Sequence, residues 1–180
     1  MAVAGFCLFD TAIGACGIAW SDSAIVTCQL PEQHREGTVR RMKRWHPDAQ
    51  ESTPPEWVSG IIARVQGLLE GGKDDLLDVP LDMAGEAEFN RRVYGVTRAI
   101  PPGRTLTYGE VAQRIGEPGS ARAVGQALGH NPFAPIVPCH RVLGAGNTGV
   151  GFSATGGVDT KLKMLEIERA RLGAHPGLFD

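Results

Sequence analysis

The chain has 180 residues, of which 42% are hydrophobic and 21% charged, with a formal net charge of −2. This length and composition suit one compact domain or two small ones, and no apolar run is long enough to span a bilayer. Because the first residues also lack the basic segment of a signal peptide, we expect a cytoplasmic or nuclear protein without a membrane partner.

The N-terminal half is predicted to form strands followed by helices. We predict short strands at residues 5–9, 15–20 and 24–30. The basic run at residues 40–44 is interpreted as a solvated helix face. Thr53 and Glu56 have the spacing of a capping box, and the apolar stripe after them predicts a helix that stops at Gly71.

The four cysteines are not predicted to form disulfides. Without a secretion signal, the thiols of Cys7, Cys16, Cys28 and Cys139 are expected to be reduced. Cys7 and Cys28 could be imagined around zinc together with His34, but this spacing fits no compact zinc motif, so no metal is predicted. We interpret the first three cysteines as small core residues.

From about residue 85 the sequence predicts helices. The first contains Phe89 and Ile100, and the second follows Thr107, which forms a capping box with Glu110. The third runs from Ala121 to about residue 129, with Ser120 as its cap. Two helices joined by a tight glycine-containing turn are typical of a helix-turn-helix, although an ordinary helical hairpin has the same pattern.

The third of these helices carries small side chains at every second position. They are Ala121, Ala123, Gly125, Ala127 and Gly129. Such a helix can bring its backbone close to a partner, and Arg122 projects from it. Residues 89–145 contain seven arginines and only two acidic residues, so a local basic face is predicted on an acidic chain. A solvated surface would explain these arginines equally well.

Cys139 is a candidate nucleophile. Prolines at positions 132, 135 and 138 fix the backbone before it, and His140 and Arg141 follow it. A nearby histidine or arginine lowers the pKa of a thiol, although neighbours in sequence need not touch. In the last helix, helical spacing puts Lys161 and Glu168 on one stripe with Met164 and Leu165. Glu168 could therefore orient His140, or these charges could lie at the edge of an apolar face.

The run Pro138-Cys139-His140-Arg141-Val142 resembles the active-site signature of the O6-alkylguanine-DNA alkyltransferases, also called methylated-DNA–protein-cysteine methyltransferases. The resemblance extends over residues 100–144 and 156–168, and more loosely over the N-terminal strands. It implies an α+β fold in which an N-terminal antiparallel-sheet domain, ribonuclease H-like, packs on a C-terminal winged-helix-like domain with a helix-turn-helix. We place the boundary after residue 82, with a structural domain at 1–82 and a DNA-binding and active-site domain at 83–180.

The resemblance also implies a role for each matching residue. Cys139 matches the alkyl acceptor, His140 the water-linked base and Glu168 the acid that polarises it. Asn131 matches the hinge asparagine between the recognition helix and the active site. Tyr108 matches the tyrosine that rotates the nucleotide and contacts the guanine.

Further matches concern the substrate and the DNA. Arg122 matches the arginine that fills the gap left by a flipped nucleotide, and Arg141 matches the signature arginine, whose task is structural. Ser153 and Lys161 match donors near the guanine oxygen, and Phe152 stands where an aromatic residue is expected. The implied DNA-binding residues are Ala121, Arg122, Ala123, Gly125 and Gln126.

The resemblance implies direct-reversal repair of DNA by a single-turnover enzyme without a cofactor. A monomer, in the cytoplasm or on the nucleoid of a prokaryote, would bind the minor groove of alkylated double-stranded DNA and flip the nucleotide. Alkyl transfer from O6-alkylguanine, and from O4-alkylthymine, to Cys139 would then follow. The alternative is a non-catalytic sensor of alkyl lesions, which would lack the acceptor cysteine. A cysteine hydrolase that uses Cys139 and His140 would leave the DNA-binding helix pair unexplained. A helix-turn-helix regulator would usually be a dimer, and the sequence has no obvious dimerisation segment.

The chain departs from the family pattern beside the expected pocket. Ala154 and Thr155 are inserted before the glycine pair at 156–157. The zinc ligands of some family members have no clear counterparts here.

Overall fold

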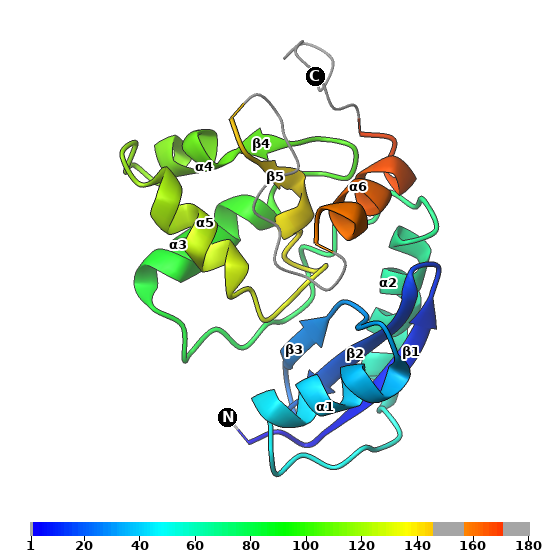
Figure 1. The fold of residues 1–180 in the computed structure, drawn as a ribbon. Helices are drawn as coiled ribbons and strands as arrows, with labels where there is room; N and C mark the ends of the chain where they lie inside the picture. Colours follow the sequence, from blue (N-terminus) through cyan, green and yellow to red (C-terminus); the bar gives the residue numbers. More distant parts are fainter. Residues whose placement is uncertain (1, 146–156, 171–180) are drawn as a thin grey trace. The chain divides into compact units, whose positions relative to one another are not determined.

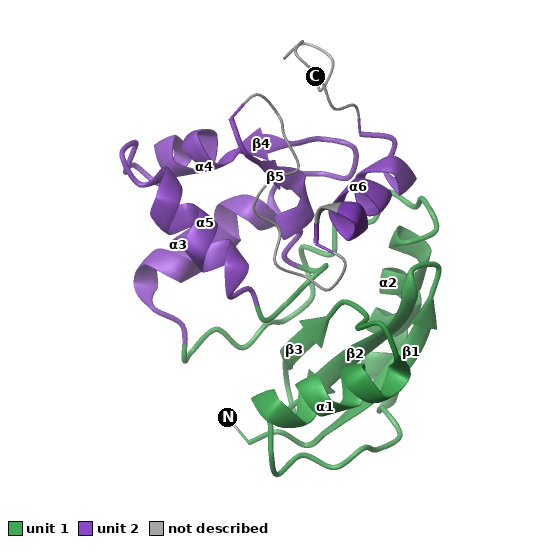
Figure 2. Ribbon diagram, viewed as in Figure 1, with its two compact units in different colours: residues 1–85, 132–136 green, residues 86–131, 137–180 purple. Residues whose placement is uncertain are grey.

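The computed structural model describes residues 2–145 and 157–170. Within these residues the fold is mixed α/β, with a small antiparallel sheet, a two-stranded sheet and six α-helices (Figure 1). The chain divides into two compact units (Figure 2). Unit 1 contains residues 1–85 and 132–136, and unit 2 contains residues 86–131 and 137–180. None of the helices in the described part of the chain could cross a membrane.

The sheet of unit 1 is a meander of three strands. They are β1 (Gly5–Thr11), β2 (Gly14–Trp20) and β3 (Ile25–Gln29), paired antiparallel in the order β1-β2-β3. Gly14 has a φ of 123°, which suits glycine at the turn between β1 and β2. The three predicted strands are confirmed. Cys7, Cys16 and Cys28 are buried in them as free thiols, as expected of core residues.

Two helices complete the secondary structure of unit 1. Helix α1 (Arg35–Trp45) contacts β2 and buries Thr38 and Met42. A Cβ atom on Gly17 would lie only 2.8 Å from the Met42 side chain, so glycine is needed for this close approach. Helix α2 (Glu56–Leu68) begins after Pro55, which makes no side-chain cap. The predicted capping box at Thr53 was therefore wrong.

Unit 2 is mainly helical. Its elements are α3 (Glu88–Arg98), β4 (Leu106–Thr107), α4 (Tyr108–Arg114), α5 (Ala121–Gly129), the 3₁₀ turn η1 (Cys139–Arg141), β5 (Val142–Leu143) and α6 (Val158–Ile167). Strands β4 and β5 are parallel, which places the start of α4 beside the residues that follow η1. Helices α3, α4 and α5 pack together, and the Tyr94 hydroxyl donates a 2.8 Å hydrogen bond to the Ala127 carbonyl.

The helix pair α4 and α5 has the predicted boundaries. Thr107 and Glu110 form the predicted capping box, with reciprocal bonds of 3.0 and 3.1 Å. Ser120 is at the cap position of α5, but its side chain makes no capping hydrogen bond. The inward side of α5 consists of Val124, Ala127 and Leu128, so its small outward side chains remain available to a partner.

Residues 132–136 belong to unit 1 although the chain before and after them belongs to unit 2. The Cys28 amide donates a 2.9 Å hydrogen bond to the Pro132 carbonyl, and Cys28 forms a parallel bridge with Phe133. The segment that leads to Cys139 is therefore fixed to the outer edge of β3.

Candidate active site

Cys139 begins the short 3₁₀ turn η1, directly after Pro138. Its side chain is buried, with 9% of the residue exposed. Its backbone amide donates a 2.8 Å bond to the Val137 carbonyl, which fixes the turn. Cys139 is therefore a buried thiol on a fixed backbone and is not a solvent-exposed nucleophile.

Competing effects act on the ionisation of Cys139. Burial raises the pKa of its thiol above the usual range, while a hydrogen bond from Asn131 and the positive charge of Lys161 act in the opposite direction. The side chains of His140 and Arg141, from which the sequence suggested a lowered pKa, bind Glu168 instead. The resting thiol therefore keeps its proton, and the reaction needs a proton acceptor.

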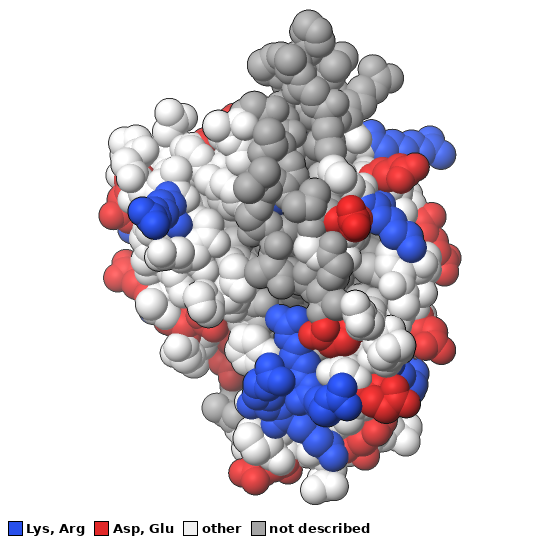
Figure 3. Space-filling view, in the orientation of Figure 1, with Lys and Arg blue, Asp and Glu red and all other residues white. Residues whose placement is uncertain are grey.

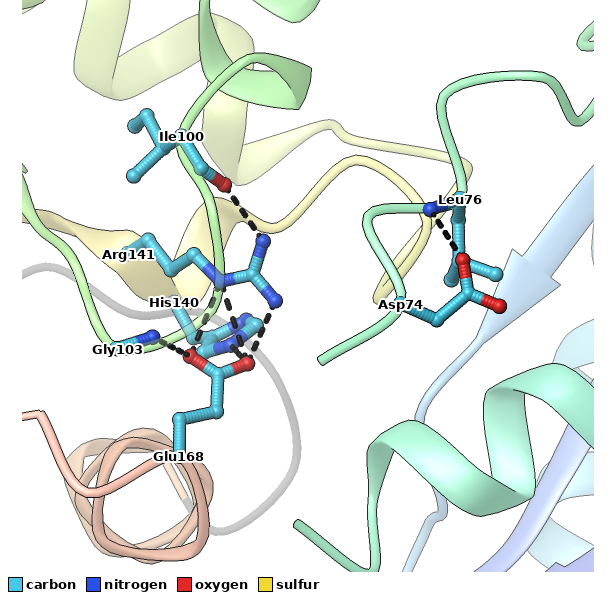
Figure 4. A network of polar contacts seen from close by, with 7 residues as sticks. All are labelled: Asp74, Leu76, Ile100, Gly103, His140, Arg141 and Glu168. Atoms are coloured by element: carbon cyan, nitrogen blue, oxygen red, sulfur yellow. Dashed lines mark hydrogen bonds and ion pairs between the residues drawn. The ribbon is translucent and has the colours of Figure 1, made fainter. Parts of the chain in front are cut away.

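His140, Arg141 and Glu168 form a buried cluster (Figure 4). The His140 Nε2 atom lies 2.8 Å from Glu168 Oε1. Arg141 donates to the same carboxylate from Nε and Nη2, with a shortest distance of 2.7 Å, and Nη1 donates to the Ile100 carbonyl at 2.7 Å. Glu168 caps the end of α6, so this cluster joins α6 to η1.

The cluster fixes the protonation of His140. Burial acts to raise the pKa of Glu168, but the attraction of His140 and Arg141 outweighs it and holds this pKa at about 2. Burial lowers the pKa of His140, which is therefore neutral near pH 7. An ionised carboxylate can only accept a hydrogen bond, so Nε2 must carry the proton of the neutral ring. Nδ1 is left as the basic nitrogen, able to receive a proton from a thiol through a water molecule.

Asn131 lies at the junction between α5 and the segment that leads to Cys139. Its Nδ2 atom donates a 2.8 Å hydrogen bond to the Val137 carbonyl, and its side chain also bonds the Cys139 thiol. One amide therefore fixes both the loop backbone and the sulfur.

Lys161 and Tyr108 lie near the thiol. The Lys161 ammonium donates a 2.6 Å hydrogen bond to the Val142 carbonyl and lies 5.7 Å from the centre of the Tyr108 ring. Burial lowers the pKa of Lys161 to about 8, partly opposed by attraction to Cys139. Burial raises the pKa of Tyr108, so the phenol remains a proton donor. These two groups could stabilise negative charge that develops on a substrate.

A cavity of about 380 Å³ opens beside Tyr108. It is lined by Thr107, Tyr108, Gly109, Ala121, Arg122 and Ala145. Arg122 is exposed on α5, and so is Gln126, while Ala121, Ala123 and Gly125 are half-buried. The cavity therefore connects the outward side of α5 with the tyrosine that starts α4.

The structure brings together the following residues that the sequence singled out: Tyr108, Asn131, Cys139, His140, Arg141, Lys161 and Glu168. All of them belong to unit 2. Phe152, Ser153 and the Ala154-Thr155 insertion lie outside the described residues. In the described part of the chain, no three histidine, cysteine, aspartate or glutamate side chains are grouped to hold a metal ion.

Sequence reasoning missed the backbone groups of the site. The carbonyls of Ile100, Val137 and Val142 bind Arg141, Asn131 and Lys161, respectively. The Gly103 amide also lies 3.5 Å from Glu168. No side-chain signal in a sequence could reveal them, because every residue type carries these groups.

Comparison with known proteins matches residues 88–170 to the DNA-binding domain of 6-O-methylguanine DNA methyltransferase. The methylated-DNA–protein-cysteine methyltransferase of Mycobacterium tuberculosis is 39% identical, over 95% of this chain and 96% of that protein. The protein of that name from Shigella flexneri is 41% identical, over 84% of this chain and 81% of its own length. Among solved structures, Mycobacterium tuberculosis OGT in complex with DNA has a TM-score of 0.74 and 35% identity, covering 98% of this chain and 99% of that one.

Proposed function

The chain belongs to the O6-methylguanine-DNA methyltransferase family, and on that premise we propose how its residues carry out direct-reversal DNA repair. The protein binds DNA and transfers a methyl group from the damaged base to one of its own cysteines. We infer that Cys139 is the acceptor. The observation that carries this assignment is a buried thiol beside a neutral histidine, which a buried carboxylate orients.

The Cys139 proton passes through water to Nδ1 of His140, and the positive charge that forms there is stabilised by Glu168. The thiolate attacks the saturated alkyl carbon, the bond between carbon and O6 breaks, and its electron pair returns to the guanine. Tyr108 and Lys161 donate hydrogen bonds to the leaving base. The base takes up one proton and His140 gives up the one that it accepted, so the proton lost by the thiol is balanced by the one gained by the guanine. The thioether product has no carbonyl that water could attack, so each molecule reacts once.

The substrate is O6-alkylguanine in double-stranded DNA, and O4-alkylthymine by the same chemistry. The nucleotide must leave the stack to reach Cys139, which costs a few kcal/mol. The small outward face of α5 suits close approach to the minor groove, and Arg122 beside the cavity suits insertion into the gap. Phe152 and Ser153 are proposed to line the base pocket.

The finer description of the architecture follows from family membership. We propose a ribonuclease H-like N-terminal domain at 1–82 and a winged-helix-like domain at 83–180. We also propose that the protein acts as a monomer. A cytoplasmic enzyme, working on the nucleoid in a prokaryote, fits this substrate.

The proposal is tested with a duplex that carries a radiolabelled methyl group on O6 of one guanine. We expect about one label per protein molecule, found on Cys139. The Cys139→Ala variant should take up none, and Cys7→Ala, which removes another buried thiol, should react like the parent protein. Label beyond one equivalent, or label on another residue, would contradict the assignment.

A further inference from the structure

Helix α1 of unit 1 carries a concentrated basic surface that the repair reaction does not use. Figure 3 shows lysine and arginine side chains gathered over α1. The helix contains Arg35, Arg40, Arg41, Lys43 and Arg44 and a single acidic residue, Glu36. The sequence suggested only a solvated helix face here.

The cations of α1 differ in their partners. Arg35 forms an exposed ion pair with Asp10 at 3.5 Å, and Arg41 pairs with Glu32 at 3.1 Å. In contrast, Arg40, Lys43 and Arg44 are exposed and have no ion pair with any side chain that the structure describes. We call these three residues the α1 basic face.

The α1 basic face lies on one side of the helix. Positions 40, 43 and 44 are neighbours on a helical surface, and they lie opposite the buried Thr38 and Met42. Lys43 and Arg44, in the last turn, interact favourably with the helix dipole, but Arg40 lies before that turn. Like charges three and four residues apart repel each other. Stabilisation of the helix alone therefore does not explain this arrangement.

We propose that the α1 basic face binds DNA phosphates, as a contact independent of sequence and additional to the contact made by α5. This inference rests on the proposed function, because that function brings the protein to duplex DNA. The charge of the face is complementary to the phosphate backbone, and arginine suits phosphate geometry because its guanidinium donates in a fork.

Binding of this kind has a measurable signature. Each phosphate neutralised by a cation releases counterions, so affinity falls with salt by a slope of about 0.9 per contact. Three such contacts would contribute about 2 to 3 to the slope of log K against log salt. The contribution is independent of base sequence and of the lesion.

The test replaces Arg40, Lys43 and Arg44 together by glutamine. Binding to an undamaged duplex is measured from low to high salt. We expect the slope to fall in magnitude by about 2 to 3 and the affinity at low salt to fall at least about tenfold. The matched control replaces Lys73, Lys163 and Arg169, exposed cations outside α1 and outside residues 89–145, by glutamine and so removes the same net charge. Its slope should change by less than about 1.

Further measurements separate the alternatives. Reaction with free O6-benzylguanine should be unchanged in the α1 variant. This reaction tests the Cys139 assignment and needs no DNA, so the two proposals can fail separately. Arg40→Lys with Arg44→Lys should keep the salt slope, and thermal unfolding should show that all variants fold. A slope equal to that of the control would overturn the proposal. It would also be overturned if the variant changed only self-association in sedimentation, because the face would then bind a second copy.

Discussion

At the scale of single residues, the buried carboxylate of Glu168 binds two buried side chains, His140 and Arg141. It compensates the permanent charge of Arg141 and orients neutral His140, all within the interior of unit 2. Removal of one partner from a buried ion pair commonly costs 3–5 kcal/mol, because the other charge remains uncompensated.

We expect Glu168→Gln to lower the free energy of unfolding by about 3 kcal/mol at pH 7. Alkyl transfer should slow by about 100-fold, because His140 becomes a weaker base. The exposed neighbour on α6 gives the control Glu166→Gln, for which both quantities should stay near those of the parent protein. Urea unfolding and single-turnover rates measure the two effects, and equal behaviour of the two variants would contradict the role of Glu168.

The same substitution has a predictable pH dependence. The folded protein holds the pKa of Glu168 at about 2, below its ordinary value, so its stabilisation is complete above the ordinary value. That stabilisation is lost as the pH falls towards 2. The difference in stability between the parent protein and Glu168→Gln should therefore be larger at pH 7 than at pH 3.

The sequence could predict which side chains meet here, because residues 161, 164, 165 and 168 share a helical stripe and all four are buried. It could not predict the direction of the Cys139 pKa. Burial raises this pKa, and Asn131, which is eight residues away, only partly opposes it. The adjacent His140 and Arg141 instead turn their side chains towards Glu168.

At the scale of elements, the caps of two helices show what local sequence determines. Thr107 and Glu110 form the predicted capping box because nothing between them prevents helical backbone. Thr53 and Glu56 have the same spacing, but Pro55 forces the residue before it out of helical conformation. Helix α2 can therefore begin only after Pro55.

The prediction for an element concerns α5. Because Arg122 lies beside the cavity and is proposed to fill the gap left by the flipped nucleotide, Arg122→Ala should slow repair of duplex DNA by about 10- to 100-fold. Reaction with free O6-benzylguanine should change by less than about twofold, since no nucleotide is flipped. Arg114→Ala, an exposed arginine at the end of α4, is the control. Equal losses on both substrates would contradict the proposal that Arg122 fills the gap left by the flipped nucleotide.

At the scale of the whole molecule, a count of charges along the sequence overestimates the basic surface of unit 2. Arg141 is buried, and Arg92 bonds Glu117 and the Ile115 carbonyl. The run at 40–44, interpreted from sequence as merely solvated, leaves three cations without an ion pair in the described structure. Only the structure, which shows the ion pairs, distinguishes the arginines of unit 2 that are buried or bonded from the α1 cations that form no described ion pair.

The assignment of residues 132–136 to unit 1 gives a prediction for the whole chain. A protein of residues 86–180 lacks the β3 edge to which Pro132 and Phe133 bind. Because small displacements of reacting groups are costly, we expect its reaction with O6-benzylguanine to be about 100-fold slower. Addition of a separate chain of residues 1–85 should restore part of the rate. An unimpaired rate in the shorter chain would contradict the need for this attachment.

The hydrogen bond between Cys28 and Pro132 also bears on the order in which parts of the protein fold. The two residues are more than a hundred positions apart in the sequence, so the bond between them closes a long loop and cannot form early from local contacts. During synthesis, β3 leaves the ribosome long before the segment that pairs with it. We therefore expect the site around Cys139 to be completed late in folding, after the helices α3, α4 and α5 between these two positions have formed.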